Sequence, residues 1–450
     1  MMAPRLIELH RVLKPTGSIY LHCDPAASHY LKMVMDAVFG PMNFRNEIIW
    51  QRTTAHSNIY KSFGRLHDTI LFYIKKDENT TWNVRYTDYS EEHIEKSYRY
   101  IENGTGRRYA RRDLTASMSR ASSGQLYEWK GIRPPETRCW AYTKDNMEEF
   151  EKAGRIVYSK KGYPRLKVYL DEMPGVPLQD IGIDIRPVQS QSRERLDYPT
   201  QKPEALLERI IEASSNKGDV VLDPFCGCGT AIVAAQKLKR PWIGIDVTQA
   251  AMVVIKKRLN DTFGEKVSFE VIGEPVSVAD AKVLAEQEPY QFQWWALGLI
   301  SARPVEQKKG ADKGVDGRLY FHDEAGTKAK TKQIIISVKS GEKVTVSQLR
   351  DLRGVIDRED AEIGVLISMA NPTRDMRKEA ASAGFYKSAW GKHPRLQLLT
   401  IEELLSGKGI DYPPSEQVNV TLKRAPKAKS GTTVTQPQLF HKEGKQPAEN

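Results

Sequence analysis

Hydrophobic positions in residues 1–79 alternate between a helical and a strand-like spacing. Leu6, Leu9 and Leu13 recur about every three to four residues, which places their side chains on one face of a helix. The turn Pro15-Thr16-Gly17 separates them from a run of β-forming residues. The elements expected in order are a helix over 6–13, a strand over 18–22, a helix over 28–39 and strands over 47–50 and 69–74. This alternation predicts part of an α/β sheet.

The spacing then changes, which predicts four further segments. Residues 80–190 lose clear periodicity and are rich in Arg, Tyr, Trp, Gly and Pro, as in a loop-rich inserted domain. Regular alternation of helical and strand patterns returns over 191–262 and again over 263–416, so both are expected to be α/β units. The last segment, 417–450, is rich in Lys, Pro, Gln and Thr and has little to bury, so we expect a disordered tail.

The composition excludes several broad classes of protein. The chain has 450 residues, of which 40% are hydrophobic and 28% charged, as is typical of globular proteins with several domains. No run of about 18 apolar residues is present and the N-terminus lacks the layout of a signal peptide, so we expect a cytoplasmic protein without membrane spans. Four cysteines are too few for a disulfide framework, and Cys226 and Cys228 have no second pair to complete a zinc site. The net charge of +11 favours a polyanionic partner.

The strongest candidate site lies where a buried-strand pattern runs into a glycine turn. The strand over 219–223 is followed by the turn Asp223-Pro224-Phe225-Cys226-Gly227-Cys228-Gly229-Thr230 and by a helix over 231–238. The next strand ends in Asp246, which stands 17 residues after Gly229. An acid at about this distance from a glycine turn commonly binds ribose hydroxyls. The pattern therefore predicts a nucleotide-binding turn with Asp246 as a ribose ligand.

The form of this turn indicates the kind of nucleotide. The third glycine of a dinucleotide fingerprint would fall at Ile232 and is missing, which argues against a pyrophosphate held on the helix N-terminus. Two bare glycines instead let an adenosine and an amino-acid moiety approach the backbone closely, which favours S-adenosylmethionine. The alternative is a glycine turn that merely lets helix and strand pack.

Several motifs in residues 1–262 resemble those of one enzyme family. Tyr198-Pro199-Thr200-Gln201-Lys202-Pro203, the helix that follows it and the glycine turn are similar to motifs X and I of the amino-methylating DNA methyltransferases of the β arrangement. Segments 11–20, 46–50 and 67–73 resemble the catalytic half of that family. In this family the catalytic half comes first, the recognition domain follows and the cofactor half comes last. The resemblance implies a permuted Rossmann-type sheet with an inserted recognition domain.

The resemblance also implies a cofactor, a substrate and a set of contacts. The cofactor is S-adenosylmethionine, and the substrate is an exocyclic amino group in double-stranded DNA, with adenine N6 favoured over cytosine N4. Pro203 suits the first turn of a helix, where its missing N–H costs nothing. The implied cofactor-binding residues are Lys202, Pro203, Asp223, Phe225, Gly227, Gly229, Thr230 and Asp246.

One motif of the family is not found in the chain. Methylation of an amino group needs acceptors for its hydrogens and an aromatic face for the base, which the family provides in a D/N/S-P-P-Y/F/W tetrapeptide. The Pro-Pro pairs here follow Arg133 and Tyr412, and Asp24-Pro25-Ala26 lacks the second proline and the aromatic residue. We therefore expect a methyltransferase shortened before motif IV that transfers no methyl group by itself. The expected assembly is a homodimer or a complex with a partner chain that supplies this motif.

A basic stretch with interleaved aromatic residues marks the middle of 80–190. Over 104–138, eight basic residues outnumber three acids, and Tyr109, Tyr127 and Trp129 lie among them. Arginines neutralise phosphates or contact guanine edges, and aromatic rings stack on displaced bases. The alternative is a solvated charged surface. The family has its target recognition domain here, and the predicted DNA contacts are Arg107, Arg108, Arg111, Arg112 and Arg133.

Two strand patterns in 263–416 flank a polar turn and bring an acid towards a lysine. A hairpin of 315–321 and 333–339 folded about its centre places Asp316 opposite Lys339, and Arg318 opposite Ser337, on one side of the sheet. A magnesium-dependent phosphodiesterase needs a carboxylate that holds the metal and a lysine that stabilises charge. The alternative is structural, with Asp316 capping a turn and Lys339 solvated.

This hairpin resembles the Mrr-like branch of the PD-(D/E)xK restriction nucleases, on segments 310–317 and 337–341. The resemblance implies a smaller α/β nuclease-type domain whose site comprises Asp316, Lys339 and the position of Ser337, with Asp316 as the Mg²⁺ ligand. The family has Glu or Gln where this chain has Ser337, which is a weaker, uncharged ligand. The acids that are candidates to compensate are Glu286, Glu288 and Asp312.

These patterns support two hypotheses from different classes. The first is a restriction–modification polypeptide, in which an adenine-favouring DNA methyltransferase is fused to an endonuclease-like domain. The second is a DNA-binding protein, inert in methyl transfer, for which the cofactor is a structural or regulatory ligand. An in-frame D/N/S-P-P-Y/F/W sequence in the DNA upstream of the Met1 codon would favour the first hypothesis.

Overall fold

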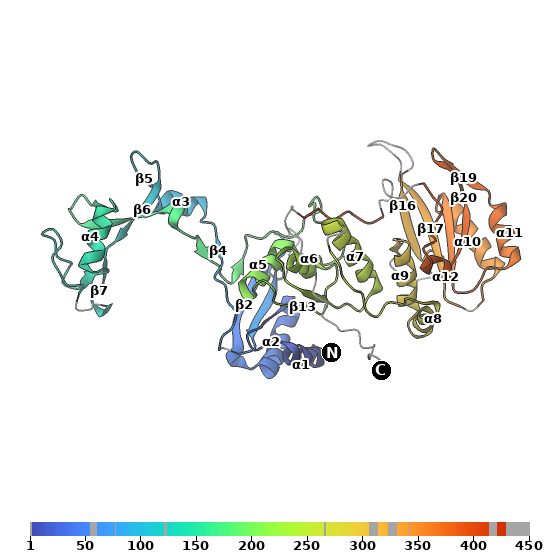
Figure 1. The fold of residues 1–450 in the computed structure, drawn as a ribbon, viewed down its shortest axis with the longest axis horizontal. Coiled ribbons are helices and arrows are strands. Elements are labelled where there is room, and N and C mark those ends of the chain that lie inside the picture. Colours follow the sequence, from blue (N-terminus) through green and yellow to red (C-terminus); the bar gives the residue numbers. More distant parts are fainter. Residues whose placement is uncertain are drawn as a thin grey trace, which may run out of the picture. The chain divides into compact units, whose positions relative to one another are not determined.

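The computed structural model of the chain comprises two compact units, whose elements are labelled in Figure 1. The first contains residues 1–83 and 181–450, and the second contains residues 84–180. In the sequence, the second unit is therefore an insertion into the first. The residues that the structure describes are 2–54, 61–76, 78–120, 124–264, 267–305, 314–322, 331–341, 343–413 and 421–428.

The N-terminal part of the first unit is a four-stranded sheet in the order β1-β3-β2-β12. Strand β3 pairs antiparallel with both β1 and β2, and β12 lies parallel to β2. The helices and strands of this part are α1 (Met2–Val12), β1 (Ser18–Cys23), α2 (Pro25–Phe39), β2 (Phe44–Gln51), β3 (His67–Ile74) and β12 (Ile181–Gly182). All the elements expected for residues 1–79 are present, within a few residues of their expected ends.

The central position of β3 explains its continuous run of hydrophobic residues, since both of its faces are covered. Leu71 and Tyr73 pack against α1 and α2 on one face, and Ile70 packs beneath Leu206 on the other. Asp24 caps α2 by accepting a hydrogen bond from Ala27 N at 2.9 Å. The partial likeness of residues 24–26 to motif IV is therefore a helix cap.

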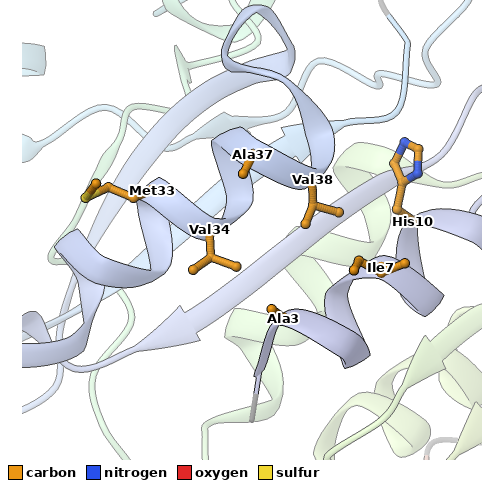
Figure 2. Close-up of a pocket in the computed structure, with 7 residues that line it drawn as sticks. All are labelled: Ala3, Ile7, His10, Met33, Val34, Ala37 and Val38. Atoms are coloured by element: carbon orange, nitrogen blue, oxygen red, sulfur yellow. The ribbon is translucent and has the colours of Figure 1, made fainter.

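An apolar groove lies between α1 and α2, as Figure 2 shows. The exposed side chains Ile7 and Met33, at 54% and 72% accessibility, stand on its two sides. The other residues that line it are Ala3, His10, Val34, Ala37 and Val38.

The chain from 191 to 264 forms helices around a parallel pair of short strands. Strands β13 and β14 run in the same direction, with Val221 opposite Trp242 and Asp223 opposite Gly244. The connecting helix α6 is alanine-rich and almost wholly buried, which allows it to pack closely on the strands and on α5. The elements are α5 (Glu204–Ser214), β13 (Val221–Asp223), α6 (Thr230–Lys237), β14 (Trp242–Gly244) and α7 (Gln249–Phe263).

The C-terminal part of the first unit is a five-stranded sheet in the order β15-β16-β17-β18-β21, with helices on both faces (Figure 1). Phe292 and Trp295 of α9 enter the core on one face, and Leu349 and Leu352 of α10 enter the core on the other. Strands β17, β18 and β21 are parallel, and their nearly continuous hydrophobic sequences match burial on both faces. Together with the N-terminal sheets, this part confirms the predicted α/β class.

The bounds of the C-terminal elements are α8 (Val278–Gln287), α9 (Pro289–Leu299), β15 (Arg303–Pro304), β16 (Gly317–Phe321), β17 (Lys332–Lys339), α10 (Val346–Arg358), β18 (Ile363–Ser368), α11 (Arg374–Ser382), β19 (Phe385–Ser388), β20 (Gly391–Pro394), β21 (Leu396–Thr400) and α12 (Ile401–Leu405). Within the expected tail, the structure describes residues 421–428. There Thr421 hydrogen-bonds to Tyr320, and Ala425 N donates to Asp261 Oδ2 at 3.1 Å. No helix in the described part of the chain is long and apolar enough to cross a bilayer.

The second unit is built on a four-stranded sheet in the order β5-β6-β10-β9. One face packs on α4 through a core that contains Trp140, Met147 and Leu166. The elements are β4 (Tyr86–Thr87), α3 (Glu91–Ser97), β5 (Tyr100–Ile101), β6 (Arg108–Asp113), β7 (Thr115–Ser117), β8 (Arg138–Trp140), α4 (Lys144–Lys152), β9 (Ile156–Tyr158), β10 (Pro164–Tyr169) and β11 (Val176–Pro177). More of 80–190 is in regular strands and helices than its sequence indicated, because its strands are too short, at two to six residues, to show a clear hydrophobic period.

Candidate functional site

The glycine turn connects the carboxyl end of β13 to the N-terminus of α6. Gly227 and Gly229 have φ angles of +49° and +73°, in the left-handed region that glycine adopts at little cost. A Cβ atom on Gly227 would lie 3.3 Å from Cε1 of Tyr198, and one on Gly229 would lie 3.0 Å from Cγ1 of Ile255. Both glycines are therefore required by backbone conformation and by close packing, and Tyr198 of the motif X segment lies directly against the turn.

Asp246 lies beside this turn, just after β14. Its Oδ2 accepts a hydrogen bond from Gly227 N at 2.8 Å, and its Oδ1 accepts from Thr248 N at 3.0 Å and Thr248 Oγ1 at 2.9 Å. Thr248 is also the N-cap of α7. The Asp246 carboxylate therefore joins the glycine turn to the start of the next helix, at the strand end where the sequence predicted a ribose ligand.

Asp223 ends the neighbouring strand and accepts a hydrogen bond from Phe225 N at 3.1 Å. Burial raises the pKa of its carboxyl group, and the negative charge of Asp246 raises this pKa further. Two carboxylates thus stand at the ends of adjacent parallel strands. Exposed apolar side chains lie at the same edge, namely Phe225, Ile245 and Val247.

This edge fits S-adenosylmethionine better than a nucleotide with phosphates. Its carboxylates can accept hydrogen bonds from ribose hydroxyls and from an ammonium group, and they repel phosphate. The exposed Phe225 and Val247, at 47% and 74% accessibility, can cover an apolar purine ring. The donor and acceptor chemistry of the edge therefore matches the cofactor that the sequence implied.

Lys202 and Pro203 lie between the N-terminal sheet and the glycine turn. The Lys202 ammonium lies 3.5 Å from Asp68 Oδ2 on β3, while its backbone oxygen accepts from Thr230 Oγ1 at 3.3 Å. Pro203 is the buried N-cap of α5, one residue before the helix. Lys202 thus connects the glycine turn, through its backbone, to the N-terminal sheet, through its side chain.

Sequence reasoning assigned no role to the polar group around Asp68. This carboxylate is 4% exposed and lies 2.9 Å from His22 Nε2 and 3.1 Å from Arg52 Nη1. Burial lowers the pKa of His22, and the nearby Lys202 charge lowers it further. Trp50 borders the group, with its indole ring 5.8 Å from that of His22. Asp68 lies within segment 67–73, whose resemblance to the catalytic half was the available signal.

The five arginines predicted to contact DNA have different surroundings in the second unit. Arg107 donates to Asp171 and Glu172 at 2.8–2.9 Å, and its guanidinium lies 3.8 Å from the Tyr169 ring centre. Arg111 lies 3.9 Å from the ring centre of Tyr100.

The other three arginines are exposed to solvent. Arg133 is exposed and donates to Glu128 at 3.2 Å. Arg108 and Arg112 are exposed and alternate along β6, so they point to one side of the strand. Neither forms an ion pair with another residue that the structure describes. Arg108 and Arg112 are therefore the arginines of this set whose charges are least committed within the protein.

The nuclease-like hairpin has a register that differs by two residues from the predicted one. Gly317 lies opposite Ile336 and Arg318 lies opposite Ile335, so Asp316 comes level with Ser337 and not with Lys339. The prediction that Asp316 faces Lys339 and Arg318 faces Ser337 was wrong, because the hairpin does not fold about its sequence centre. A shift of two residues leaves every side chain on its predicted side of the sheet.

Asp316 is a buried carboxylate with several hydrogen bonds. Its Oδ2 accepts from Val338 N at 2.7 Å and Ser337 Oγ at 3.1 Å, and its Oδ1 accepts from Gln293 Nε2 at 3.0 Å. The Lys339 ammonium lies 4.0 Å from Oδ2. The amide of Gln293, on α9, is a neighbour that the sequence analysis missed, because it stands 23 residues earlier on another element.

The donors around Asp316 fit a magnesium ion poorly. No group of three His, Cys, Asp or Glu side chains suited to a metal occurs among the described residues. Glu286 is largely exposed and lies near Lys282, Glu288 is the residue before α9 and forms no side-chain capping hydrogen bond, and Asp312 lies outside the described residues. The possible metal ligands that remain are the Asp316 carboxylate, the Ser337 hydroxyl and the Gln293 amide. Mg²⁺ instead prefers carboxylates complemented by phosphate oxygens.

Comparisons with known proteins match two consecutive stretches of the chain to two different families. The family model described as DNA methylase matches residues 1–257, and that described as restriction endonuclease matches residues 284–406. Type II methyltransferase M.EcaI from Enterobacter cloacae is 33% identical over 257 residues, which cover 57% of this chain and 56% of that protein.

Two further similarities extend the comparison. DNA adenine methyltransferase YhdJ from Escherichia coli is 26% identical over 255 residues, covering 57% of this chain and 64% of that protein. The crystal structure of the M1.HpyAVI–SAM complex is 18% identical with a TM-score of 0.31, covering 58% of this chain and 82% of that one. The chain spans less than two thirds of the length of both curated relatives. Since the DNA methylase model matches more than half of its length, the chain belongs to the DNA methylase family.

Proposed function

We propose that the chain is the cofactor-binding and DNA-recognising part of a restriction–modification methyltransferase that uses S-adenosylmethionine on double-stranded DNA. The observation that carries the proposal is the hydrogen bond from Gly227 N–H to Asp246 across the ends of two parallel strands. Adenine N6 is the favoured acceptor over cytosine N4, supported by the similarity to an adenine methyltransferase.

In this proposal the residues of the edge bind and orient the cofactor. S-adenosylmethionine supplies an activated methyl group when bound. Gly227 and Gly229 give it access to the backbone, while Asp246 and Asp223 accept hydrogen bonds from its hydroxyl and ammonium groups. Phe225 and Thr230 flank these groups at the start of α6, and Lys202 with Pro203 holds the opposing segment in place.

Isothermal titration calorimetry of the full chain with S-adenosylmethionine tests this assignment. Asp246→Asn keeps the shape of the side chain but removes its charge, so we expect affinity to fall at least tenfold. Asp219→Asn is the matched control, since Asp219 precedes the same strand pair and lies 3.7 Å from Lys14. Equal affinity of wild type and Asp246→Asn would remove Asp246 from the site.

For DNA recognition we propose that Arg108 and Arg112 supply the main phosphate contacts of the second unit, and that Arg111 and Arg133 supply further ones. The double variant Arg108→Ala with Arg112→Ala should bind DNA at least tenfold more weakly. The salt dependence of binding should also fall, since each lost phosphate contact removes about 0.9 from the slope of log K against log salt. Arg107→Ala should instead lower the thermal stability of the second unit, because Arg107 forms ion pairs with Asp171 and Glu172.

We propose that an extended segment carrying the missing tetrapeptide completes the methyl-transfer site. Among the described residues, β1 is paired on one edge by β3, and β13 is paired on one edge by β14. Lys14 and Asp219, which precede these two strands, lie 3.7 Å apart. One further strand would pair with both open edges, and its carboxyl end would lie near Asp246 and His22.

A methyl-transfer assay tests this proposal. The chain alone should label DNA with tritiated methyl groups no better than a blank without enzyme, whereas co-expression with a segment containing the D-P-P-Y tetrapeptide should restore labelling. The same segment with Asp replaced by Ala is the control. Persistent inactivity with a bound segment would favour the alternative function, an inert DNA-binding protein that keeps the cofactor fold.

As an alternative to a separate completing segment, we propose that the chain forms a homodimer. The groove between α1 and α2 exposes Ile7 and Met33, and a second copy of the chain is the occupant we propose for it. Light scattering decides between monomer and dimer, and Met33→Lys should convert a dimer to a monomer.

The second candidate function is magnesium-dependent cleavage of DNA by the C-terminal domain, favoured by the restriction endonuclease match over residues 284–406. Asp316, Ser337 and Lys339 are the proposed site residues, with Asp316 as the ligand of Mg²⁺. The ligands around Asp316 fit this ion poorly, so activity is expected to be weak. Nicking of plasmid DNA with magnesium should be slow in wild type and abolished in Lys339→Ala.

A further inference from the structure

A buried arginine outside the motifs named above connects three segments of the cofactor half. Arg258 lies on α7 and is 2% exposed. Its Nη1 donates to the backbone oxygen of Cys228 at 2.9 Å and to Thr230 Oγ1 at 3.0 Å, and its Nη2 donates to Glu204 Oε1 at 2.9 Å. One guanidinium group therefore binds the glycine turn, the start of α6 and the start of α5.

The stability of the fold does not by itself account for this buried ion pair. Taking a charged group out of water costs several kcal/mol, and a well-packed apolar replacement of both partners is often neutral or stabilising. Glu204 is 8% exposed, and its second oxygen is bound by Lys237. What an apolar pair lacks is the rigid, planar set of donors by which arginine holds several acceptors in fixed directions.

Arg258 acts on the part of the turn where the backbone is most free. Cys228 stands between two glycines with positive φ angles. The peptide group between Cys228 and Gly229 is held at one end by Arg258 and at the other by the hydrogen bond from Gly229 N to Cys226 O at 2.7 Å. Its plane, and with it the direction of the neighbouring N–H groups, is therefore fixed before a ligand arrives.

The same guanidinium also reaches the motif X segment through one intermediate. Thr230 Oγ1 accepts from Arg258 and donates to the Lys202 backbone oxygen at 3.3 Å. The segment that ends in Lys202 contains Tyr198, whose ring touches the turn at Gly227. Arg258 thus fixes both walls of the proposed cofactor site, and its hydrogen bonds go to Cys228, Thr230 and Glu204 and not to Asp223 or Asp246.

We propose that Arg258 is a positioning residue that holds the turn at 226–230 and the segment at 198–202 in their cofactor-binding arrangement. The inference rests on the proposed function in that the ligand is S-adenosylmethionine. It predicts that the contribution of Arg258 to cofactor affinity is separable from its contribution to stability.

The experiment compares four forms of the full chain by calorimetric titration with S-adenosylmethionine and by amide hydrogen exchange without ligand. Arg258→Lys retains the charge but loses the planar fork, and should weaken affinity at least tenfold. It should also speed exchange of the amides at 226–230 at least tenfold. The double variant Arg258→Met with Glu204→Gln should be nearly as thermally stable as wild type. Its affinity for S-adenosylmethionine should remain low, and its amides at 226–230 should still exchange fast.

Lys237→Met is the matched control, because Lys237 binds the same Glu204 carboxylate, and its ion pairs with described residues go to Glu204 and Glu208 of α5 and not to the turn. This variant should lower thermal stability and change affinity and turn exchange less than twofold. Wild-type affinity and exchange in the double variant, or equal losses in Lys237→Met, would overturn the proposal. A wild-type chain that binds no S-adenosylmethionine would refute the proposed cofactor, and the exchange of 226–230 in the unliganded variants would then decide the role of Arg258.

Discussion

Asp223, which is partly buried, and Asp316, which is buried, are both acids at strand ends, yet their surroundings differ. Asp223 accepts a hydrogen bond from Phe225 N, has Asp246 as a neighbouring acid, and has a raised pKa. Asp316 accepts hydrogen bonds from Val338, Ser337 and Gln293 and has Lys339 at 4.0 Å. The protein thus leaves the Asp223 charge poorly compensated and compensates that of Asp316 well.

The difference indicates how each acid contributes. A poorly compensated carboxylate lowers the stability of the folded protein. A ligand that supplies hydrogen-bond donors to it restores this stability, which is typical of binding sites. A carboxylate with three internal hydrogen bonds stabilises its own domain, and a metal has to compete with those donors for its oxygens. The glycine-turn edge is therefore prepared for a ligand, and the nuclease-like edge is largely satisfied without one.

The largest expected effect is at the glycine turn. In Gly227→Val the new Cβ would lie 3.3 Å from the Tyr198 ring at a φ of +49°, so affinity for S-adenosylmethionine should fall more than about 100-fold. Gly218→Val is the control, because Gly218 also has a positive φ, +92°, but open space around it. It should lose stability and keep its affinity, as calorimetry can measure. Similar losses of affinity in both variants would show that backbone strain alone, and not the site, is responsible.

The second effect concerns the stability provided by Asp316. Asp316→Ala leaves the donors of Val338, Ser337 and Gln293 without their acceptor, which should lower the unfolding free energy of the C-terminal domain by about 2–3 kcal/mol. Asp316→Asn keeps one acceptor oxygen and should lose less. Scanning calorimetry of the full chain measures both. An unchanged transition in the alanine variant would contradict the view that this acid is structurally satisfied.

The third effect is expected from a substitution of Ser337 that gives Asp316 a neighbouring acid, as Asp223 has in Asp246. Ser337→Glu places a second carboxylate beside Asp316, since Ser337 Oγ lies 3.1 Å from Asp316 Oδ2. Without metal the two charges should repel and lower stability by about 1–2 kcal/mol, and millimolar magnesium should restore it. Thermal unfolding with EDTA or magnesium measures this, and plasmid nicking should increase in parallel. Magnesium-independent stability would argue against a weakened metal site.

The glycine turn could be predicted from the sequence because its determinants are local. Gly227, Gly229 and Asp246 lie within a short stretch, and backbone conformation and parallel strand ends bring them together. The helices and strands of residues 1–79 were predicted for the same reason, since each has its own hydrophobic period.

Most contacts between distant segments were not predicted, although the approach of Lys339 to Asp316 was. The hairpin of Asp316 was placed two residues out of register because its polar connection does not have to be symmetric. Arg107 was assigned to DNA, although Asp171 binds it from 64 residues away. Likewise, Lys202 was assigned to the cofactor, and its ammonium pairs with Asp68 on β3. Residue type and spacing indicate charge, but only tertiary structure shows which charge is already neutralised.

The smallest expected effect tests the poor compensation of Asp223 directly. Its pKa is raised in the folded state by burial and by Asp246, so the folded chain keeps a proton at pH values where the unfolded chain has released it. Stability should therefore decrease as pH rises from the ordinary aspartate pKa of about 3.8 through the raised one, and the loss is complete above it. Asp223→Asn removes this loss, so at neutral pH the unliganded variant should be more stable than wild type by about 0.5–1 kcal/mol. The two proteins should converge in stability as pH approaches the ordinary aspartate pKa.

Urea unfolding of both proteins at several pH values measures the difference between their stabilities, in which the titration of other groups cancels. The variant should also bind S-adenosylmethionine more weakly, because the carboxylate that destabilises the empty site is the one we propose accepts hydrogen bonds from the ligand. A variant less stable than wild type at neutral pH would show that Asp223 is compensated in the same way as Asp316, and the contrast between the two acids would then fail.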